Sequence, residues 1–315
     1  MKLSVLVCTY KRPDLIAKLL ADMEAAAAVV SREWELIVVD NADDAGTKEA
    51  CHSSQLLNKN LQYFHEPKTG LSSARNRAVK ESVGEYLLFL DDDVSFEPNF
   101  IKQMLEAIGK YNVDVLCPKM ITQIEPQWPN WLQIRIKSGV GQFNLGEEEK
   151  PLNESTKIPV GACMCIRRMI FESYGPFNEN LGRNGKKLFG GEESLLFSQA
   201  FANSATGIYV PSIVIRHEFV SGKSTKKYWR NQGFYGGRSR VRMLEYREPE
   251  QFTNRKLGLL AGTSIVKSAI RFVVMAINPK EAFENQYRAI AHFGIAYEAI
   301  ATIFTSANKS DRGNL

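Results

Sequence analysis

The stretch Tyr86-Leu-Leu-Phe-Leu-Asp91-Asp92-Asp93 joins five apolar or aromatic residues to three consecutive carboxylates. A run of large apolar side chains is typical of a strand that is buried on both faces, as in a parallel sheet. In open α/β sheets, ligands bind just beyond the carboxyl ends of the strands. Oxygen ligands suit Mg²⁺ or Mn²⁺, which proteins usually hold with one or two carboxylates and the phosphates of a substrate. The stretch therefore indicates a divalent-metal and phosphate site, with a solvated acidic turn ahead of Pro98 as the alternative.

Strand-like and helix-like patterns alternate over the first two thirds of the chain. Strands are predicted at residues 3–8, 34–39, 61–64, 85–90, 113–121 and 158–166, and two further short strands at 208–211 and 213–216. This alternation predicts an α/β fold with a doubly wound, mostly parallel sheet and right-handed crossovers. Beyond about residue 225 only helical patterns remain, so a helical C-terminal region is expected.

Three segments follow from these patterns. Residues 1–222 are predicted to form the sheet domain, residues 223–305 the helical region, and residues 306–315 a flexible tail rich in Ser, Asn, Lys, Asp and Gly. In the helical region, two apolar patterns at 257–277 and 282–304 have two interpretations. They form a subdomain that packs on the sheet, or a helix pair that lies on a membrane surface.

The charge of the chain is uneven, although its formal net value is only +5. Residues 216–256 contain 11 Lys/Arg against 4 Asp/Glu. Such a stretch is either a solvated helical face or a surface that meets phosphates or anionic lipid. A nucleic-acid partner is not predicted, and peripheral membrane contact stays open.

The cysteines and the apolar runs indicate a cytoplasmic protein. Five cysteines are an odd number, scattered through apolar strands without a zinc-like spacing, so free thiols in a reducing compartment are expected. The apolar run at the amino terminus is too short for a signal peptide. We find no run of about 18 uncharged apolar residues and expect no membrane-spanning helix.

Several chemistry-bearing residues follow predicted strands, and these strand ends are expected along one edge of the sheet. Thr9 and Tyr10 follow the first strand, Asp40 the second, and the three acids the fourth. An aromatic ring that can stack, an acid that can accept a hydrogen bond, and a metal-binding cluster together describe a nucleoside-diphosphate site. Arg75, on the helix before the acidic strand, is expected to neutralise or orient one of the acids.

Two further candidates lie in the second half of the chain. Glu192 and Glu193 follow a glycine-rich segment and open a predicted helix, where acids are favoured by the helix dipole alone. Their functional interpretation is a general base that deprotonates an acceptor hydroxyl. His217 ends a predicted strand and is a third metal ligand, a phosphate contact or a structural histidine.

Taken in order, these pieces resemble the family 2 glycosyltransferases of GT-A fold. The resemblance covers about residues 3–220 and rests on these segments: Ser4-Val-Leu-Val-Cys-Thr-Tyr with Arg12, Val38-Val-Asp-Asn, Gly70-Leu-Ser-Ser-Ala-Arg-Asn, Phe89-Leu-Asp-Asp-Asp, Gly161-Ala-Cys-Met-Cys-Ile-Arg-Arg, Tyr174-Gly-Pro-Phe-Asn-Glu, Gly190-Gly-Glu-Glu, and Tyr209-Val-Pro ahead of His217. Each segment alone is weakly specific, but their shared order is specific for the family.

The resemblance implies an enzyme that transfers a single sugar with inversion from a nucleoside-diphosphate sugar, UDP-sugar being favoured, to a glycan or lipid-linked acceptor. It implies a Mn²⁺ or Mg²⁺ cofactor. It also implies that the protein acts in the cytoplasm, either free or at the inner face of the cell membrane. Polysaccharide biosynthesis for the cell envelope is the expected context. Single transfer is expected because the Gln-x-x-Arg-Trp signature of processive synthases is missing; Trp229-Arg-Asn-Gln232 has the letters in another order.

The resemblance also implies residue roles. The residues that would bind the nucleotide sugar are Thr9, Tyr10, Arg12, Asp40, Arg75, Asp91 and Asp92, and those that would hold the metal are Asp93, Asp91 and His217. Glu193 would be the catalytic base, with Glu192 as the other candidate. The family usually has Glu-Asp where this chain has Glu192-Glu193, so the choice between the two stays open. Two alternatives remain, a nucleotidyltransferase and a non-catalytic protein that binds sugar nucleotides or glycans. The first would more typically carry a glycine-rich phosphate loop after the first strand, and residues 8–13 contain no glycine.

Overall fold

The computed structural model describes residues 1–30, 32–137, 142–153, 155–156, 161–218 and 221–312. The chain divides into two compact units, here called the sheet unit and the helical unit. The sheet unit comprises Met1–Trp128, Ile136–Glu179 and Glu192–Val220, and the helical unit comprises Pro129–Arg135, Asn180–Gly191 and Ser221–Leu315. Two internal segments, 129–135 and 180–191, thus belong with the C-terminal helices rather than with the sheet that surrounds them in sequence.

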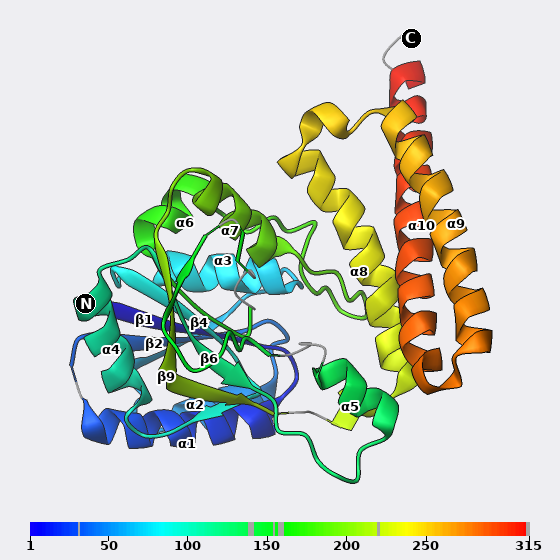
Figure 1. Cartoon of the computed structure of the whole chain (residues 1–315). Coiled ribbons are helices and arrows are strands. Elements are labelled where there is room, and N and C mark those ends of the chain that lie inside the picture. The colour runs from blue at the N-terminus through cyan, green and yellow to red at the C-terminus, as the bar shows by residue number, and fades with distance from the viewer. Residues whose placement is uncertain (31, 138–141, 154, 157–160, 219–220, 313–315) are drawn as a thin grey trace. The chain divides into compact units, whose positions relative to one another are not determined.

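The sheet unit is built on one mixed sheet with the strand order β3-β2-β1-β4-β8-β6-β9-β5, and β7 pairs with β9 (Figure 1). The strands from β3 to β4 are all parallel, whereas β8, β5 and β7 pair antiparallel with their neighbours. The strands are β1 Leu3–Thr9, β2 Trp34–Asp40, β3 Leu61–His65, β4 Tyr86–Asp91, β5 Val94–Phe96, β6 Val115–Ile121, β7 Lys150–Leu152, β8 Cys163–Arg167 and β9 Gly207–His217. The predicted α/β class with a mostly parallel, doubly wound sheet is confirmed.

Helices cover both faces of this sheet. In Figure 1, α1 and α2 lie on one side, and α3, α6 and α7 lie on the other. Because both faces are covered, the parallel strands are apolar along their whole length rather than in alternate positions. The helices are α1 Pro13–Val29, α2 Ala45–Ser53, α3 Leu71–Glu81, α4 Phe100–Tyr111, α6 Arg168–Tyr174 and α7 Glu192–Ala202.

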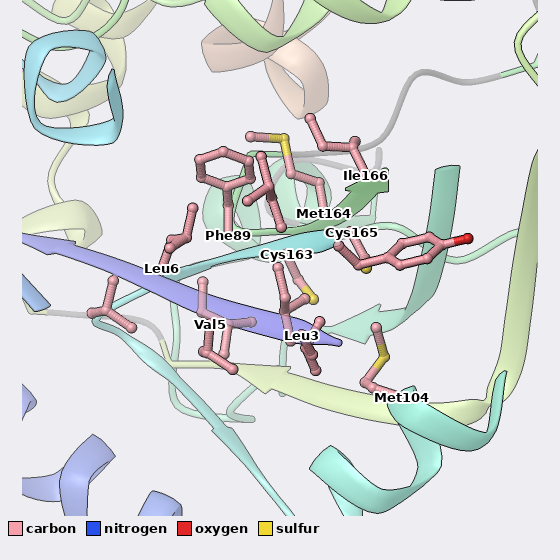
Figure 2. Packing of buried hydrophobic residues seen from close by; sticks show 14 of the residues in the cluster. Leu3, Val5, Leu6, Phe89, Met104, Cys163, Met164, Cys165 and Ile166 are labelled. Carbon is pink, nitrogen blue, oxygen red and sulfur yellow. The ribbon is translucent and has the colours of Figure 1, made fainter. Parts of the chain in front are cut away.

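The core lies between the strands and these helices. Figure 2 shows Leu3, Val5 and Leu6 of β1 near Phe89 of β4 and the apolar residues of β8, with Met104 of α4 close by. Burying one such large side chain contributes about 1.5–3 kcal/mol to folding. The cysteines are all free and four are fully buried, so the prediction of free thiols is confirmed.

Two predicted strands differ from the observed ones. The two short strands expected at 208–211 and 213–216 are one continuous strand, β9, whose pairing with β6 shifts register between Pro118 and Lys119. Pro211 does not end the strand because the register shift absorbs it, as prolines at sheet irregularities commonly do. The strand expected at 158–166 is β8, Cys163–Arg167, and the start of that prediction, residues 158–160, lies outside the described residues.

The helical unit contains three long helices, α8 Lys226–Arg247, α9 Asn254–Ile277 and α10 Ala282–Arg312, together with most of the short α5, Asn130–Lys137. Both α8 and α9 pack along α10. Glycines allow the close approach of α8 to α10, because a Cβ on Gly237 would lie 2.0 Å from the Ala291 carbonyl oxygen and one on Gly294 would lie 2.1 Å from that of Phe234.

One expectation for the C-terminal end differs from the structure. The tail expected from residue 306 is instead helical to Arg312, because each further residue of a helix adds one backbone hydrogen bond at small entropic cost. In the part of the chain that the structure describes, one helix, α9, is long and apolar enough to cross a membrane when judged by length and composition alone. In the sequence of α9, Lys267 and Arg271 interrupt the apolar run, so the helix contains no stretch of about 18 uncharged apolar residues.

Candidate active site

The ends of β1, β2 and β4 meet at one edge of the sheet. Thr9 pairs with Asp40 across β1 and β2, and Cys8 pairs with Asp91 across β1 and β4. This confirms the expectation that the residues after these strands lie side by side. Tyr10, just beyond β1, leaves 43% of its surface exposed, so its ring is accessible to a flat ligand.

The middle acid of the cluster is held by the first strand and the loop behind it. The Thr9 hydroxyl donates a 2.7 Å hydrogen bond to Oδ2 of Asp92, and Arg12 Nη1 donates a 2.7 Å bond to Oδ1. Arg12 Nη1 also lies 3.5 Å from Oδ2 of Asp93. Burial raises the pKa of Asp92, and the charge of Arg12 opposes this shift. Asp92 therefore joins the first loop to the acidic turn.

The other two acids meet His217 at the end of β9. Nε2 of His217 lies 3.2 Å from Oδ1 of Asp93. One potential ligand atom from each of Asp91, Asp93 and His217 lies within 4.8 Å of the others. His217 reaches this place because β9 pairs antiparallel with β5, the short strand that follows the acids, and Val94 lies opposite it. The three residues predicted as metal ligands are thus brought together.

Arg75 lies at the junction between the acidic strand end and the second pair of acids. Its side chain is almost fully buried, and Nη1 donates a 2.8 Å hydrogen bond to Oε1 of Glu192. Nη2 donates a 2.9 Å bond to the carbonyl oxygen of Gly161 and lies 3.4 Å from Oδ1 of Asp91. The guanidinium also lies against the ring of Phe177, 5.8 Å from its centroid. Arg75 therefore contacts one acid at the end of β4 and one at the start of α7.

The two adjacent glutamates have different surroundings. Glu192 is buried and ion-paired with Arg75, whereas Glu193 is half-buried. Burial raises the pKa of Glu193 well above the ordinary glutamate value, and the neighbouring Glu192 adds to the shift. A carboxyl with a raised pKa accepts a proton more readily at neutral pH, which suits a general base. Glu193, which the resemblance implies as the base, thus differs from Glu192 in burial and in charge pairing.

The carboxylate of Asp40 accepts hydrogen bonds within its own turn. It is fully buried, and its carboxylate accepts hydrogen bonds from the backbone N–H groups of Ala42 and Asp44, at 2.9 and 2.7 Å, and from the Tyr63 hydroxyl at 3.1 Å. The carboxylate of Asp40 therefore caps its own turn. Asp40 shares the sheet edge with the other predicted site residues through its strand pairing with Thr9.

Comparison with known proteins identifies the family. Residues 4–175, more than half of the chain, match the sequence profile of glycosyl transferase family 2. The chain belongs to glycosyl transferase family 2. The matched segment contains both the acidic strand end and Arg75.

Two known glycosyltransferases and one polysaccharide biosynthesis protein illustrate the likeness. The succinoglycan biosynthesis protein ExoM of Rhizobium meliloti is 23% identical over 298 residues, which cover 92% of this chain and 90% of ExoM. The solved structure of S. aureus TarS 1-349 in complex with UDP-GlcNAc has a TM-score of 0.56 at 18% identity, covering 96% of this chain and 92% of that one. The mannosyltransferase PcManGT from Pyrobaculum calidifontis, in complex with GDP-Man and Mn2+, has a TM-score of 0.55 at 15% identity, covering 98% of this chain and 75% of that one. At these identities the two structures show a shared fold.

Three residues of this glycosyltransferase that carry the site were not assigned a role from the sequence. The carbonyl of Gly161 accepts from Arg75, and a Cβ at this glycine would lie 3.0 Å from Nη2 of that arginine. Asn76 fixes the segment that carries the Phe177 ring, because its side chain bonds both the backbone N–H and the carbonyl of Phe177. Asn41 accepts a 2.7 Å bond from the N–H of Gly70, at the start of α3. All three lie in segments that resemble the family, and that resemblance is the sequence signal that could have pointed to them.

Proposed function

We propose that this glycosyltransferase moves one sugar, with inversion, from a nucleoside-diphosphate sugar to a hydroxyl of a glycan or lipid-linked acceptor. The observation that carries the proposal is the buried Arg75, which links Asp91 of the acidic strand end to Glu192 beside the candidate base. The linkage supports a donor site and a proton acceptor held in one structure. UDP-sugar is the favoured donor.

The nucleotide is assigned to the edge formed by β1, β2 and β4. The exposed ring of Tyr10 stacks on the base. Asp40 holds the turn after β2 in place. Thr9 and Arg12 hold the carboxylate of Asp92 in place, so these three residues shape the nucleotide site indirectly. Asp91 and Asp92 face the ribose and diphosphate in this proposal, and Arg75 orders the site between the strand end and the base.

Asp91, Asp93 and His217 are assigned to a divalent ion. The donor set of two carboxylates and one imidazole fits Mn²⁺, and two carboxylates also fit Mg²⁺. A solved relative of the same fold, PcManGT, is described with GDP-Man and Mn2+. When bound, the ion would neutralise charge on the departing diphosphate, which is commonly a large part of such catalysis.

Glu193 is assigned as the general base. Its raised pKa and partial exposure suit it to take the proton from the acceptor hydroxyl as the oxygen attacks the sugar, whereas the pairing of Glu192 with Arg75 makes Glu192 the positioning member of the pair. Inversion follows from one direct displacement. Single transfer follows from the missing processive signature.

The proposed biological role is the synthesis of a cell-envelope or exported polysaccharide. The proposed place of action is the cytoplasm or the inner face of the membrane. ExoM is named for succinoglycan biosynthesis, and TarS is named as a poly(ribitol-phosphate) beta-N-acetylglucosaminyltransferase. These names support an envelope polymer or its lipid-linked precursor as the acceptor class.

A thermal-shift panel tests the donor site. The melting temperature is measured with UDP, GDP, CDP and dTDP, each with and without Mn²⁺, on wild type, on Asp93→Ala, and on Glu106→Ala as a matched loss of an exposed acid on α4. A nucleotide bound only to the native state at 100 times its Kd adds about 2.7 kcal/mol of stability. We expect one nucleotide to raise the melting temperature of wild type and Glu106→Ala only when Mn²⁺ is present, and to leave Asp93→Ala unchanged.

Absence of a shift with every nucleotide and metal would contradict the donor site. Release of free sugar from the matching nucleotide sugar, in the absence of acceptor, then separates a transferase from a protein that only binds the nucleotide. Binding without any hydrolysis or transfer would support the non-catalytic alternative.

A further inference from the structure

The outer face of α9 carries large apolar side chains in contact with solvent. Leu259, Val266, Ile270, Val273 and Ile277 recur at intervals of seven, four, three and four residues, which places them on one side of the helix. All five are exposed, and Leu259 and Ile277 show 70% and 76% of their surface. Scattered exposed apolar residues are normal, but a continuous row on one helix face marks an interaction surface.

The opposite face of α9, which is buried against the helical unit, is made mostly of small residues. Leu257, Ala261, Ser264 and Ser268 are buried and recur at intervals of four, three and four. The Ser268 hydroxyl donates a 2.9 Å hydrogen bond to the Ala289 carbonyl of α10. In a water-soluble helix the large apolar residues face inward. Small residues and a serine bond between helices, with large apolar residues outside, are typical of helices in contact with lipid.

A second apolar row lies on α10. Phe293, Tyr297, Ile300 and Phe304 recur at intervals of four, three and four, and all are exposed. The rings of Phe293 and Tyr297 lie against Phe234 of α8, with centroid distances of 6.0 and 5.5 Å, so this second row borders α8. We call the row on α9 the apolar face.

The charges on α9 are all positive. The helix contains no Asp or Glu. Arg255 lies in line with the apolar row, and Lys256, Lys267 and Arg271, at intervals of eleven and four, lie along one flank of it. Arg271 donates to Asn285 within the unit, and Lys256 and Lys267 are exposed. This flank is complementary to anionic headgroups.

Several arginines of the basic stretch, residues 216–256, form contacts within the helical unit. In α8, Arg238 and Arg242 both pair with Glu298 of α10, and Arg230 donates to Gln286. These charges hold the helical unit together. The flank of α9, rather than these arginines of α8, is the one that combines positive charge with exposed apolar residues.

We propose that the apolar face of α9 docks on an anionic lipid bilayer, with α9 lying in the plane of the interface. An in-plane helix keeps Lys267 and Arg271, near the middle and end of the apolar run, at headgroup level, whereas a spanning helix would carry them into the hydrocarbon. The inference goes beyond the proposed transfer reaction, because it concerns neither the donor site nor the base.

Vesicle binding without nucleotide tests the proposal. Cosedimentation is measured with phosphatidylcholine vesicles that contain no phosphatidylglycerol or about 30% of it, a content that gives an anionic surface. The full chain is compared with Val266→Asp/Ile270→Asp and with a control, Val83→Asp/Met169→Asp, which adds the same charges at exposed apolar residues of the sheet unit. We expect wild type and control to bind the anionic vesicles, and the α9 variant to bind at least about tenfold more weakly.

A second set of variants tests the charged flank of α9. Lys256→Gln/Lys267→Gln is expected to weaken binding by about fivefold per charge removed, and binding of wild type is expected to fall as salt screens the surface. Far-UV circular dichroism and the melting temperature check that each variant is folded. If the double aspartate variant does not fold, Ile277→Asp, at the exposed end of α9, takes its place.

Three results would overturn the proposal: no binding of wild type to anionic vesicles at low salt, equal binding of wild type and the α9 variant, or a lipid-free wild-type dimer that the α9 variant turns into a monomer. The last would assign the apolar face to a second copy of the chain. Because no nucleotide is present, the outcome is independent of the thermal-shift test of the donor site.

Discussion

Arg75 and Glu192 form a buried ion pair of 2.8 Å between residues that are 117 positions apart in the sequence. Both side chains are only 4% exposed. The same guanidinium lies 3.4 Å from Asp91, so one residue joins the acidic strand end to the start of α7. A single buried side chain of the sheet unit therefore contacts both the proposed donor site and the acid next to the proposed base.

Loss of this guanidinium should be strongly destabilising. Arg75→Met leaves Glu192 buried without its charge partner, and breaking a buried pair in this way costs about 3–5 kcal/mol. The free energy of unfolding is measured by urea denaturation. Arg77→Met, on the same helix, removes a more exposed pair with Glu81 and should cost at most about 1 kcal/mol. Equal losses for the two variants would contradict the central role of Arg75.

Replacement of the two glutamates should separate catalysis from positioning. Glu193→Gln removes the proposed base and should lower kcat by roughly 10²–10⁴-fold while KM for the donor stays close to wild type. Glu192→Gln should weaken the pairing with Arg75, lower the melting temperature and reduce activity to a smaller extent. Steady-state kinetics and thermal melts of both variants provide the comparison. A Glu193→Gln enzyme with wild-type kcat would exclude this residue as the base.

The raised pKa of Glu193 predicts a pH-dependent stability difference. Because the folded-state pKa lies above the unfolded value of about 4.3, folding favours the protonated acid and opposes the carboxylate. This penalty is absent at low pH and grows as the pH rises from about 4.3 through the folded-state pKa. Glu193→Gln, which stays neutral, should gain stability relative to wild type over that interval. Melting temperatures from pH 4 to 9 test this, and a constant difference at all pH values would show that Glu193 is not perturbed.

Gly161 should tolerate no larger side chain. A Cβ would lie 3.0 and 3.2 Å from the two terminal nitrogens of Arg75, which Glu192 holds in place. Gly161→Ala should therefore cost about 1–3 kcal/mol, as forced overpacking does. Gly109→Ala is the matched control, because no atom lies within 4 Å of its Cβ position and alanine favours the helix by up to about 1 kcal/mol. Chemical denaturation distinguishes the two, and a neutral effect at Gly161 would show that Arg75 can move.

Much of the fold could be predicted from the sequence because its signals are local. Uninterrupted apolar runs such as residues 86–90 indicate strands buried on both faces, and alternation with helical patterns indicates parallel crossovers. Local signals failed where an irregularity replaced a break, as at Pro211 in β9. There the pairing of the whole strand with β6 outweighed the single residue.

The amino-acid sequence by itself determined which acids stand at the sheet edge, because parallel strands that end in Asp40 and Asp91 must end on the same side. Only the tertiary structure decided how those acids differ. The antiparallel strand β9 brought His217 to Asp93, burial placed Arg75 against Glu192, and packing on α10 turned the small residues of α9 inward. Charge pairing, pKa and the exposed face of a helix depend on neighbours that are distant in sequence, and the chain crossovers alone determine which neighbours those are.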